Sequence, residues 1–453
     1  MTATPSATHD LINLMDPAWT SDPRSLVDRV ASAGGSAPAL FADGFEVVLF
    51  ADDEDVRTIL SDRRFVVDPA NVREGATTQR KSQLLETMGI TPDLAAYVSE
   101  SVLQMDGADH TRLRKLVSRA FTVRRVNELR PKVQRITDDL LARLPDHAQE
   151  DGSVDLLEHF AYPLPITVIC DLVGVAEEDR PAWREWSRTL QEFDPTRPER
   201  MNAVLGAMID HIKSTIARRR AEPQDTLLDA LIAEQDEDGG RLSEAELITL
   251  VFTLVIAGHE TTAHLLTNGT HALLTHRDQW DLLRSDPELV PAAVHEMLRW
   301  CGVALLTQVR YAAEDIRLKG GRLAAGDRAV ALIAGANRDP DVYPDPHRFD
   351  ITRHHGKPGE SHVGFGHGIH YCLGAAWPGR RDRSPSLRWS GPTRTWTSRP
   401  AASPHGRTRP ERCGSGICTC ASAATDAAAA PGVVPGAAEN TGRVRRRNTR
   451  RRG

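Results

Sequence analysis

The chain has 453 residues, a formal net charge of −6 and a hydrophobic fraction of 40%. These values are typical of a folded globular protein and exclude a disordered, fibrous or membrane-embedded chain. Six cysteines are too few for a disulfide scaffold, so we expect a cytoplasmic protein. We expect neither a signal peptide in Met1–Trp19 nor a membrane anchor, since no window has the roughly 18 apolar residues that a membrane span needs.

The first 376 residues predict a fold that is mainly α with small β-sheets. Strands are predicted at 45–50 and, less regularly, at 307–310 and 328–333, and prolines make residues 340–358 irregular. Residues 69–106 predict loop and short helix. Helical patterns cover 53–61, 108–120, 126–144, 163–173, 180–193, 201–221, 226–236, 277–285 and 289–300.

A long helix is predicted from a capping box at Ser243–Glu246 to about Thr275. Its centre, Leu247–Ala257, is almost wholly apolar, which predicts burial on all sides. The small Ala257 and Gly258 follow, and then an acid and an alcohol, Glu260 and Thr261, which are rarely buried without a partner. A Glu260 that faces solvent and a Thr261 that bonds back to a carbonyl would be the structural alternative.

The most specific pattern is FGHGIHYCLG at Phe365–Gly374. Glycines such as Gly366 and Gly368 allow positive φ and a close approach of a flat ligand to the backbone. A cysteine at the end of such a turn, just before a helix, has amide N–H groups that stabilise a thiolate. Cys372 could therefore be an axial haem ligand; a lone buried structural cysteine is the alternative.

This motif resembles the haem-ligand loop of the cytochrome P450 family. Four further segments agree with the family in order and separation, and together the resemblance covers about residues 10–376. These segments are His110–Arg114, Ala257–Thr261, Glu296–Arg299 and the stretch from Asn337 to Phe349. The resemblance implies a cytochrome P450 fold and haem b, with Cys372 as the ligand of the haem iron and Phe365, Gly368 and Gly374 in the haem loop.

The resemblance also implies roles for residues outside the loop. Gly258 would line the groove in which dioxygen binds, Thr261 would bond the iron-bound oxygen, and Glu260 would relay protons. Glu296 and Arg299, three apart on one helix face, would form a structural ion pair in the core. The haem propionates would be bound by His110, Arg114, Arg310 and His370. For His110 and Arg114, which are four residues apart, a solvated basic helix face is the alternative.

The resemblance implies a haem-dependent monooxygenase that takes electrons from ferredoxin and a ferredoxin reductase. It would insert one oxygen atom of dioxygen into a lipophilic substrate, by hydroxylation or epoxidation, in secondary metabolism. We expect a monomer that binds no nucleic acid.

A basic cluster in a domain of charge −18 suggests a docking patch for an acidic ferredoxin, with solvated charge as the alternative. A peroxide-driven or isomerising haem-thiolate protein is disfavoured by the acid–alcohol pair. The cluster comprises Arg112, Lys115, Arg119, Arg124 and Arg125.

The composition changes after Ala376. Residues 377–453 carry 16 Arg, no Lys and four acids, so this tail has a charge of +12 and leaves −18 for residues 1–376. The family has a helix directly after the cysteine loop, but here Pro378 and Gly379 follow, and a proline inside a helix costs roughly 3 kcal/mol. We therefore predict a catalytic domain at 1–376 that is incomplete at its C-terminal end, followed by a tail of low order.

A frameshift after Ala376 explains this change economically. Reading one base earlier through Trp377 and Pro378 gives Leu-Ala-Arg for suitable codons, which family members commonly carry there. The chain as written would then be a non-catalytic product with impaired haem binding. Two alternatives remain for the tail, namely a basic appendage that binds nucleic acid and a metal site at Cys413, Cys418 and Cys420.

Overall fold

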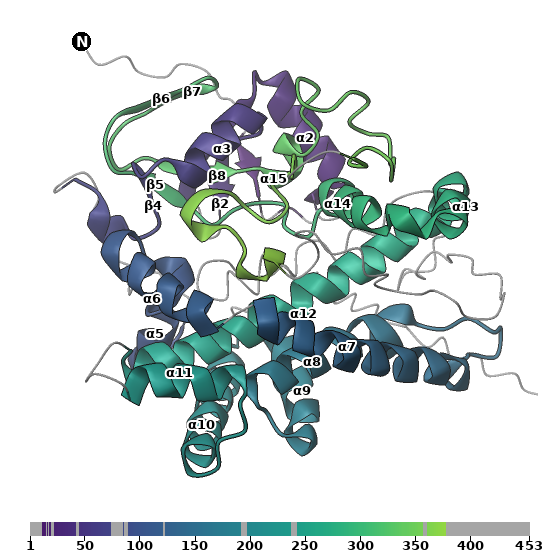
Figure 1. The fold of residues 1–453 in the computed structure, drawn as a ribbon. Coiled ribbons are helices and arrows are strands. Elements are labelled where there is room, and N and C mark those ends of the chain that lie inside the picture. Colours follow the sequence, from purple (N-terminus) through teal and green to yellow (C-terminus); the bar gives the residue numbers. More distant parts are fainter. Residues whose placement is uncertain are drawn as a thin grey trace, which may run out of the picture.

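The computed structural model describes residues 11–376 apart from 15, 17, 20–21, 42–44, 74–84, 86–88, 121–122, 192–196, 237–241 and 357–359. The Arg-rich tail and its three cysteines therefore lie outside the described residues. The described chain is mostly helical, with a sheet-containing half above a helical half in Figure 1 and the long helix α12 between them. This confirms the predicted fold class.

Most helices follow the predicted ranges to within a few residues, because their apolar stripes and start or end signals are local. At α12 the Ser243 hydroxyl accepts from the Glu246 N–H, and the Glu246 carboxylate accepts from the Ser243 N–H, so the predicted capping box is formed. The helices are α2 (Pro23–Ser32), α3 (Asp53–Ser61), α5 (Pro92–Ser99), α6 (Gly107–Ala120), α7 (Val123–Arg143), α8 (Pro163–Val173), α9 (Arg180–Gln191), α10 (Pro198–Ala221), α11 (Leu227–Asp236), α12 (Glu244–Thr275), α13 (Arg277–Ser285), α14 (Val290–Trp300) and α15 (Ile333–Ala336).

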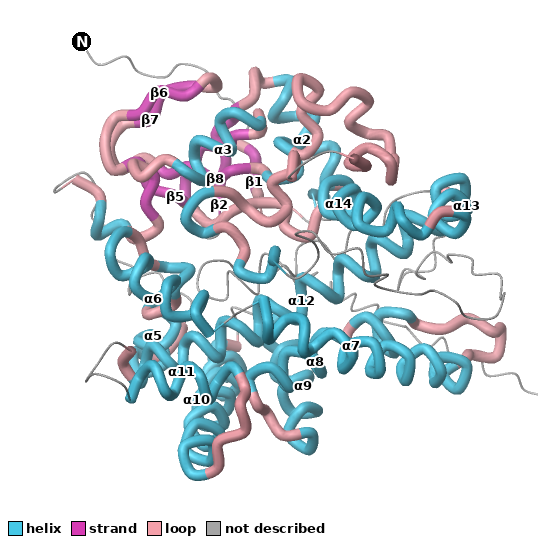
Figure 2. The backbone as a smooth tube through the Cα atoms, in the orientation of Figure 1, coloured by secondary structure: helices cyan, strands magenta, loops and turns pink. Residues whose placement is uncertain are grey.

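Among the described residues the strands form a six-stranded sheet in the order β1-β2-β3-β8-β5-β4 and a separate two-stranded sheet, β6-β7 (Figure 2). The strand predicted at 45–50 is β3, which pairs antiparallel with β2 and parallel with β8. The strand predicted at 307–310 begins only at Arg310. The strands are β1 (Ile12–Asn13), β2 (Ser36–Phe41), β3 (Phe45–Phe50), β4 (Phe65–Val66), β5 (Arg310–Ala312), β6 (Ile316–Leu318), β7 (Gly321–Leu323) and β8 (Arg328–Ala331).

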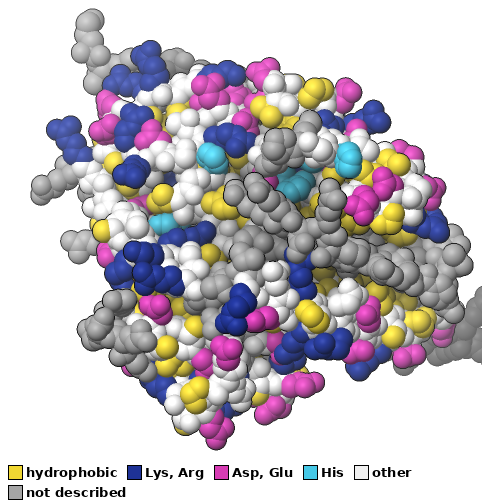
Figure 3. Space-filling model, in the orientation of Figure 1, with side chains coloured by type: hydrophobic (Ala, Val, Ile, Leu, Met, Phe, Trp, Pro, Cys, Tyr) yellow, Lys and Arg dark blue, Asp and Glu magenta, His cyan; other side chains and the backbone are white. Residues whose placement is uncertain are grey.

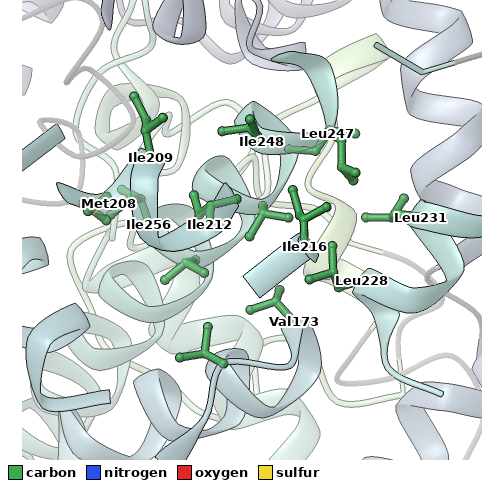
Figure 4. Packing of buried hydrophobic residues seen from close by; sticks show 14 of the residues in the cluster. Val173, Met208, Ile209, Ile212, Ile216, Leu228, Leu231, Leu247, Ile248 and Ile256 are labelled. Carbon is green, nitrogen blue, oxygen red and sulfur yellow. The ribbon is translucent and has the colours of Figure 1, made fainter. Parts of the chain in front are cut away.

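The largest apolar core lies in the helical half. Branched side chains from α8, α10, α11 and α12 interlock there, among them Val173, Ile212, Leu231 and Ile248 (Figure 4). Each such side chain contributes roughly 1.5–3 kcal/mol when it is fully buried. This core fixes α12 against α8 and α10, and α12 carries the predicted acid–alcohol pair.

Helix α12 differs from two expectations. By length and composition it could cross a membrane, contrary to the expectation that no window is apolar enough, but 61% of its most apolar window is buried inside the protein. Its apolar centre is also not buried on all sides. Phe252, Leu254 and Ala257 are partly exposed: Phe252 and Leu254 flank the buried Val251 and Val255 and still pack against the core, whereas Ala257 lies towards the opposite side of the helix.

Candidate functional site

The predicted ligand loop is a tight turn that glycines make possible. Gly366 and Gly368 have φ angles of +73° and +71°, which are unfavourable for residues with a side chain. A Cβ atom at Gly368 would lie 2.4 Å from the carbonyl oxygen of Leu60 at the end of α3, so only glycine fits there. The Cys372 N–H donates to the Phe365 carbonyl at 2.9 Å, which closes the loop and sets the direction of the cysteine.

Cys372 differs from the other two cysteines of the described chain, since Cys170 is buried and Cys301 is half-buried, whereas solvent reaches Cys372. Protein atoms surround the thiol on its other sides. The resulting desolvation raises the pKa of Cys372, although the N–H groups of Gly374 and Ala375 act in the opposite direction. A thiol of this kind loses its proton when it binds a metal, because only the thiolate is a ligand.

The helix that the family has after this loop is not formed within the described residues. Leu373–Ala376 forms a 3₁₀ turn, η8, and Ala376 is the last described residue. The two amides that face the Cys372 sulfur come from this turn, so the expected amide contribution is present. A full helix dipole would require a longer helix.

Next to the loop, four cationic or hydrogen-bonding residues come together from three elements. His110 and Arg114 lie on α6, Arg310 begins β5, and His370 ends the short 3₁₀ turn η7 (Gly368–His370). The His110 and His370 ring centroids are 4.4 Å apart, and Arg114 donates to the Tyr371 carbonyl oxygen. The structure thus places together all four residues that the sequence predicts at the haem propionates.

Within the described residues, the positive charge of this cluster is offset only in part, by Asp106. Arg310 is 6% exposed, and its Nε has no hydrogen-bond partner among the described residues; the same holds for Nε2 of His370. Burial lowers the pKa of Arg310 to about 10, only partly opposed by Asp106. Burial, together with Arg310, His110 and Arg114, lowers the pKa of His370 to about 2. Because buried donors and charges need partners, the cluster fits a bound dianion such as the two carboxylates of haem.

On α12, Thr261 and Glu260 differ in their surroundings. The Thr261 hydroxyl donates to the Ala257 carbonyl at 2.7 Å, and the side chain is half-buried on the partly exposed face of the helix. This back-bond is the structural alternative considered for Thr261, and it leaves the lone pairs of its oxygen available. Glu260 does not face solvent, since it is 1% exposed and accepts a hydrogen bond from the Tyr162 hydroxyl at 3.2 Å.

Gly258 lies against a neighbouring helix. A Cβ atom there would lie 3.1 Å from the Ile169 side chain of α8, so the glycine allows α12 and α8 to pack closely. Ile169 therefore limits the predicted room for a ligand at Gly258, although Gly258 and the preceding Ala257 are both partly exposed.

The pair of Glu296 and Arg299 lies away from the cysteine loop, in the core. Both side chains are fully buried, and Arg299 donates two hydrogen bonds to the Glu296 carboxylate, at 2.7 and 2.8 Å. Burial opposes ionisation of Glu296, but hydrogen bonds from Arg299 and His354 outweigh it and lower the pKa of Glu296 to about 2. Arg299 also donates to the carbonyl oxygens of Asn337, Pro346 and Arg348, so the pair holds α14 against the irregular segment that leads to the loop.

The predicted docking patch is largely neutralised by neighbouring acids. Arg112 pairs with Glu246, Arg119 lies 3.8 Å from Glu234, and Arg124 lies 3.0 Å from Glu128. Figure 3 shows basic and acidic side chains interspersed on the helical half of this face. Lys115 is exposed, and the side chain of Arg125 lies outside the described residues. The net positive charge of the patch is therefore smaller than the sequence suggests.

No role was predicted for three polar side chains near Glu260. Tyr162 precedes α8, and His259 and His264 are buried in α12 at 0% and 2% exposure. Burial lowers the pKa of His259 to about 3 and of His264 to about 4, so both are neutral near pH 7. His259 and His264 lie within the helix that was predicted to be buried, so the sequence pattern indicates buried histidines there. The contact of Tyr162 with Glu260 joins residues 98 apart in the chain and has no local sequence signal.

Comparison with known proteins agrees with this geometry. Residues 76–376 match the family model "Cytochrome P450". Vitamin D(3) 25-hydroxylase of Pseudonocardia autotrophica is 46% identical over 283 residues, which cover 62% of this chain and 68% of the relative. Cytochrome P450 monooxygenase PikC of Streptomyces venezuelae is 39% identical over 357 residues, covering 79% of this chain and 80% of the relative.

Solved structures show the same fold. The tirandamycin C-bound P450 monooxygenase TamI superposes with a TM-score of 0.67 at 39% identity, covering 81% of this chain and 88% of that one. Myxobacterial CYP267B1 in complex with myristic acid gives a TM-score of 0.71 at 34% identity, covering 81% and 87%. Sequence, fold and the cysteine loop lead to one conclusion: the chain belongs to the cytochrome P450 family and is an oxidoreductase of the monooxygenase type.

Proposed function

We propose that the protein uses haem b to insert one oxygen atom of dioxygen into a lipophilic organic substrate, as a hydroxylation or an epoxidation. The observation that carries this proposal is the buried cationic cluster beside Cys372, which has the donors and the charge that a haem with two propionates requires. When bound, the haem supplies the activation of dioxygen.

The residues of this chain would bind and orient the group. Cys372 would be the axial ligand of the iron, in a loop closed by Phe365 and shaped by Gly368 and Gly374. The propionates would be held by His110, Arg114, Arg310 and His370. Because a fork-shaped guanidinium binds a carboxylate through two donors, we assign the larger share of this binding to the two arginines.

Protons would be delivered from α12. Glu260 is buried, and burial raises its pKa to about 8 against the opposing effect of the Tyr162 hydrogen bond, so it carries a proton near pH 7. Thr261 is the next residue, with its hydroxyl hydrogen engaged by Ala257 and its lone pairs available as acceptors. Glu260 would hold the proton that is delivered to dioxygen, and the Thr261 oxygen would accept a hydrogen bond once that proton has been transferred. Gly258 would serve this site by letting α12 approach α8.

The substrate is proposed to be lipophilic because the partly exposed side of α12 near Phe252–Ala257 and the segment Val303–Thr307 are largely apolar. A relative named for vitamin D(3) supports a lipophilic substrate, and the 6-deoxyerythronolide B hydroxylase of Saccharopolyspora erythraea supports a role in secondary metabolism. We further propose a cytoplasmic monomer that takes electrons from ferredoxin and its reductase. The exposed Lys115 is the residue of the basic cluster best placed for such a partner.

We propose that residues 1–376 are the catalytic domain and that 377–453 derive from a frameshift. The composition changes after Ala376, the family match also ends at residue 376, and Pro378 and Gly379 stand where the family has a helix. The chain as written would then bind haem poorly, which is the non-catalytic alternative.

The reduced carbon monoxide difference spectrum of the purified chain tests the proposed function. A thiolate-type band that scales with haem content supports a haem-thiolate monooxygenase. Absence of that band in a chain whose reading frame is restored after Ala376 would contradict the proposal. Absence in the chain as written alone would support the frameshift.

A further inference from the structure

A half-buried tyrosine is bonded to the buried acid of α12. Tyr162 follows a π-helical turn, Leu157–Ala161, and its N–H donates to the Leu157 carbonyl five residues earlier at 2.9 Å. Such wide turns occur frequently at functional sites because they redirect the next side chain. Here the Tyr162 hydroxyl donates to Oε1 of Glu260 at 3.2 Å.

The two oxygens of Glu260 have different surroundings. Oε1 accepts the hydrogen bond from Tyr162, whereas Oε2 is buried and has no partner among the described residues. Glu260 is 1% exposed, while Tyr162 is half-buried. A protonated Glu260 would carry its hydrogen on Oε2, because Oε1 already accepts a hydrogen bond.

The other ionisable groups near Glu260 do not replace Tyr162. Nε2 of His259 lies 4.0 Å from Oε1, which is too far for a hydrogen bond. His264 makes an edge-to-face contact with the Tyr162 ring, with the ring centroids 6.2 Å apart. On α9, Arg184 pairs with the surface acid Glu158 and influences His259 rather than Glu260. Tyr162 is thus the polar partner of Glu260 within the described chain.

We propose that Tyr162 is a positioning residue for Glu260 and the point at which protons enter the path to it. This inference rests on the proposed role of Glu260 as the proton donor of the monooxygenase. Each proton that Glu260 releases from Oε2 leaves a carboxylate. The Tyr162 O–H bond then breaks as a new O–H bond forms on Oε1 of Glu260, and Tyr162 takes its replacement proton from a hydronium ion of the solvent, which becomes water. One proton has then moved from solvent to Glu260, no net charge stays on the tyrosine, and a half-turn of the carboxyl group returns the proton to the side away from Tyr162.

The infrared absorption of the protonated carboxyl group, followed against pH in the full chain, tests the positioning role without any requirement for turnover. Glu260→Gln identifies the band by removing it. Tyr162→Phe removes one hydrogen bond to the charged form, so the titration midpoint should rise by about one pH unit. Tyr97→Phe is the matched control. Tyr97 lies on α5, another helix that packs on α12, and its hydroxyl forms a hydrogen bond with Lys213. Its loss should leave the titration midpoint of Glu260 unchanged.

An unchanged midpoint in Tyr162→Phe would overturn the inference. Glu260→Asp is a second variant. The shorter aspartate side chain should no longer reach the Tyr162 hydroxyl, so the titration midpoint of its carboxyl band should be the same with and without Tyr162→Phe. In haem-loaded protein, Tyr162→Phe should increase both the peroxide formed per reductant and the solvent isotope effect, with an unchanged carbon monoxide spectrum. Equal values in both proteins would overturn the entry role. If no variant makes product, the proposed function fails, and the infrared result still decides the positioning role.

Discussion

Arg299 donates two hydrogen bonds to Glu296, three residues earlier on α14, and neither side chain is exposed to solvent. The same arginine donates to three backbone carbonyls of the segment 337–348. One ion pair therefore links α14 to the chain that leads into the cysteine loop. Its effect is structural, because neither residue belongs to the cluster beside Cys372.

Arg299→Gln should lower the free energy of unfolding by about 3–5 kcal/mol, since it leaves a buried carboxylate without its main partner. Urea unfolding followed by circular dichroism measures this change. Arg322→Gln is the control, because the Arg322–Asp315 pair is exposed and its loss should change little. A small effect of Arg299→Gln would mean that the network is not needed for stability.

Glu296 should also make the stability depend on pH. Its pKa is about 2 in the folded chain, because hydrogen bonds from Arg299 and His354 outweigh the effect of burial, against about 4.3 for an unfolded glutamate. The stabilisation is thus complete above the unfolded value and is lost as the pH falls from about 4 towards 2. In Glu296→Gln this contribution should be absent. Equal acid dependence in both proteins would contradict the assignment.

Arg310→Gln should weaken haem binding by roughly tenfold to a hundredfold, because it removes a charge-assisted hydrogen bond from a buried site. Transfer of haem to a competing apoprotein measures the affinity. Arg317→Gln, an exposed arginine on β6, is the matched control. Unchanged haem retention in Arg310→Gln would exclude Arg310 from propionate binding.

Most helices could be predicted from the sequence because their signals are local. Residues 163–173 and 277–285 were predicted with the bounds that α8 and α13 have, and Ser243 with Glu246 marked the start of α12. The strands β1, β2, β4, β6 and β7 and the helices α2 and α15 were not predicted, and α5 falls in the stretch 69–106 that was predicted only as loop and short helix. Strands of two or three residues carry no periodicity, and their formation depends on partners distant in the chain, as for Phe65 and Ala312.

The candidate site divides in the same way. The Gly-rich loop and the four cationic residues were recognised through a family pattern, and the structure places them together. The close approach of Gly258 to Ile169 and the contact between Tyr162 and Glu260 could not be predicted, since both depend on how α8 packs against α12. The neutralisation of Arg112 by Glu246, 134 residues away, likewise depends on the tertiary fold.

Thr261→Ala should leave haem binding intact and divert electrons from product to peroxide. The hydroxyl contacts only the helix backbone at Ala257 among the described residues, and alanine favours a helix, so the fold should persist. The ratio of product to reductant consumed is the measurement. Thr262→Ala is the control, since Thr262 is exposed and bonds to Gly258 in the same manner. A ratio equal to that of the control would exclude Thr261 from proton delivery.

Restoring the reading frame after Ala376 should increase haem content and turnover together, because the loop would regain a full helix after Cys372. Expression of both versions side by side, with haem and product measured per mole of protein, tests this. If the chain as written binds haem stoichiometrically and turns over equally fast, residues 377–453 are a genuine part of the protein.

The central claim is that Cys372 is the ligand of the haem iron, and the reduced carbon monoxide difference spectrum of Cys372→Ser tests it most directly. The measurement uses haem-containing protein, with Cys301→Ser as the control because Cys301 is half-buried and outside the loop. We predict that the thiolate-type band disappears in Cys372→Ser and persists in Cys301→Ser. A thiolate-type band that remains in Cys372→Ser would contradict the account.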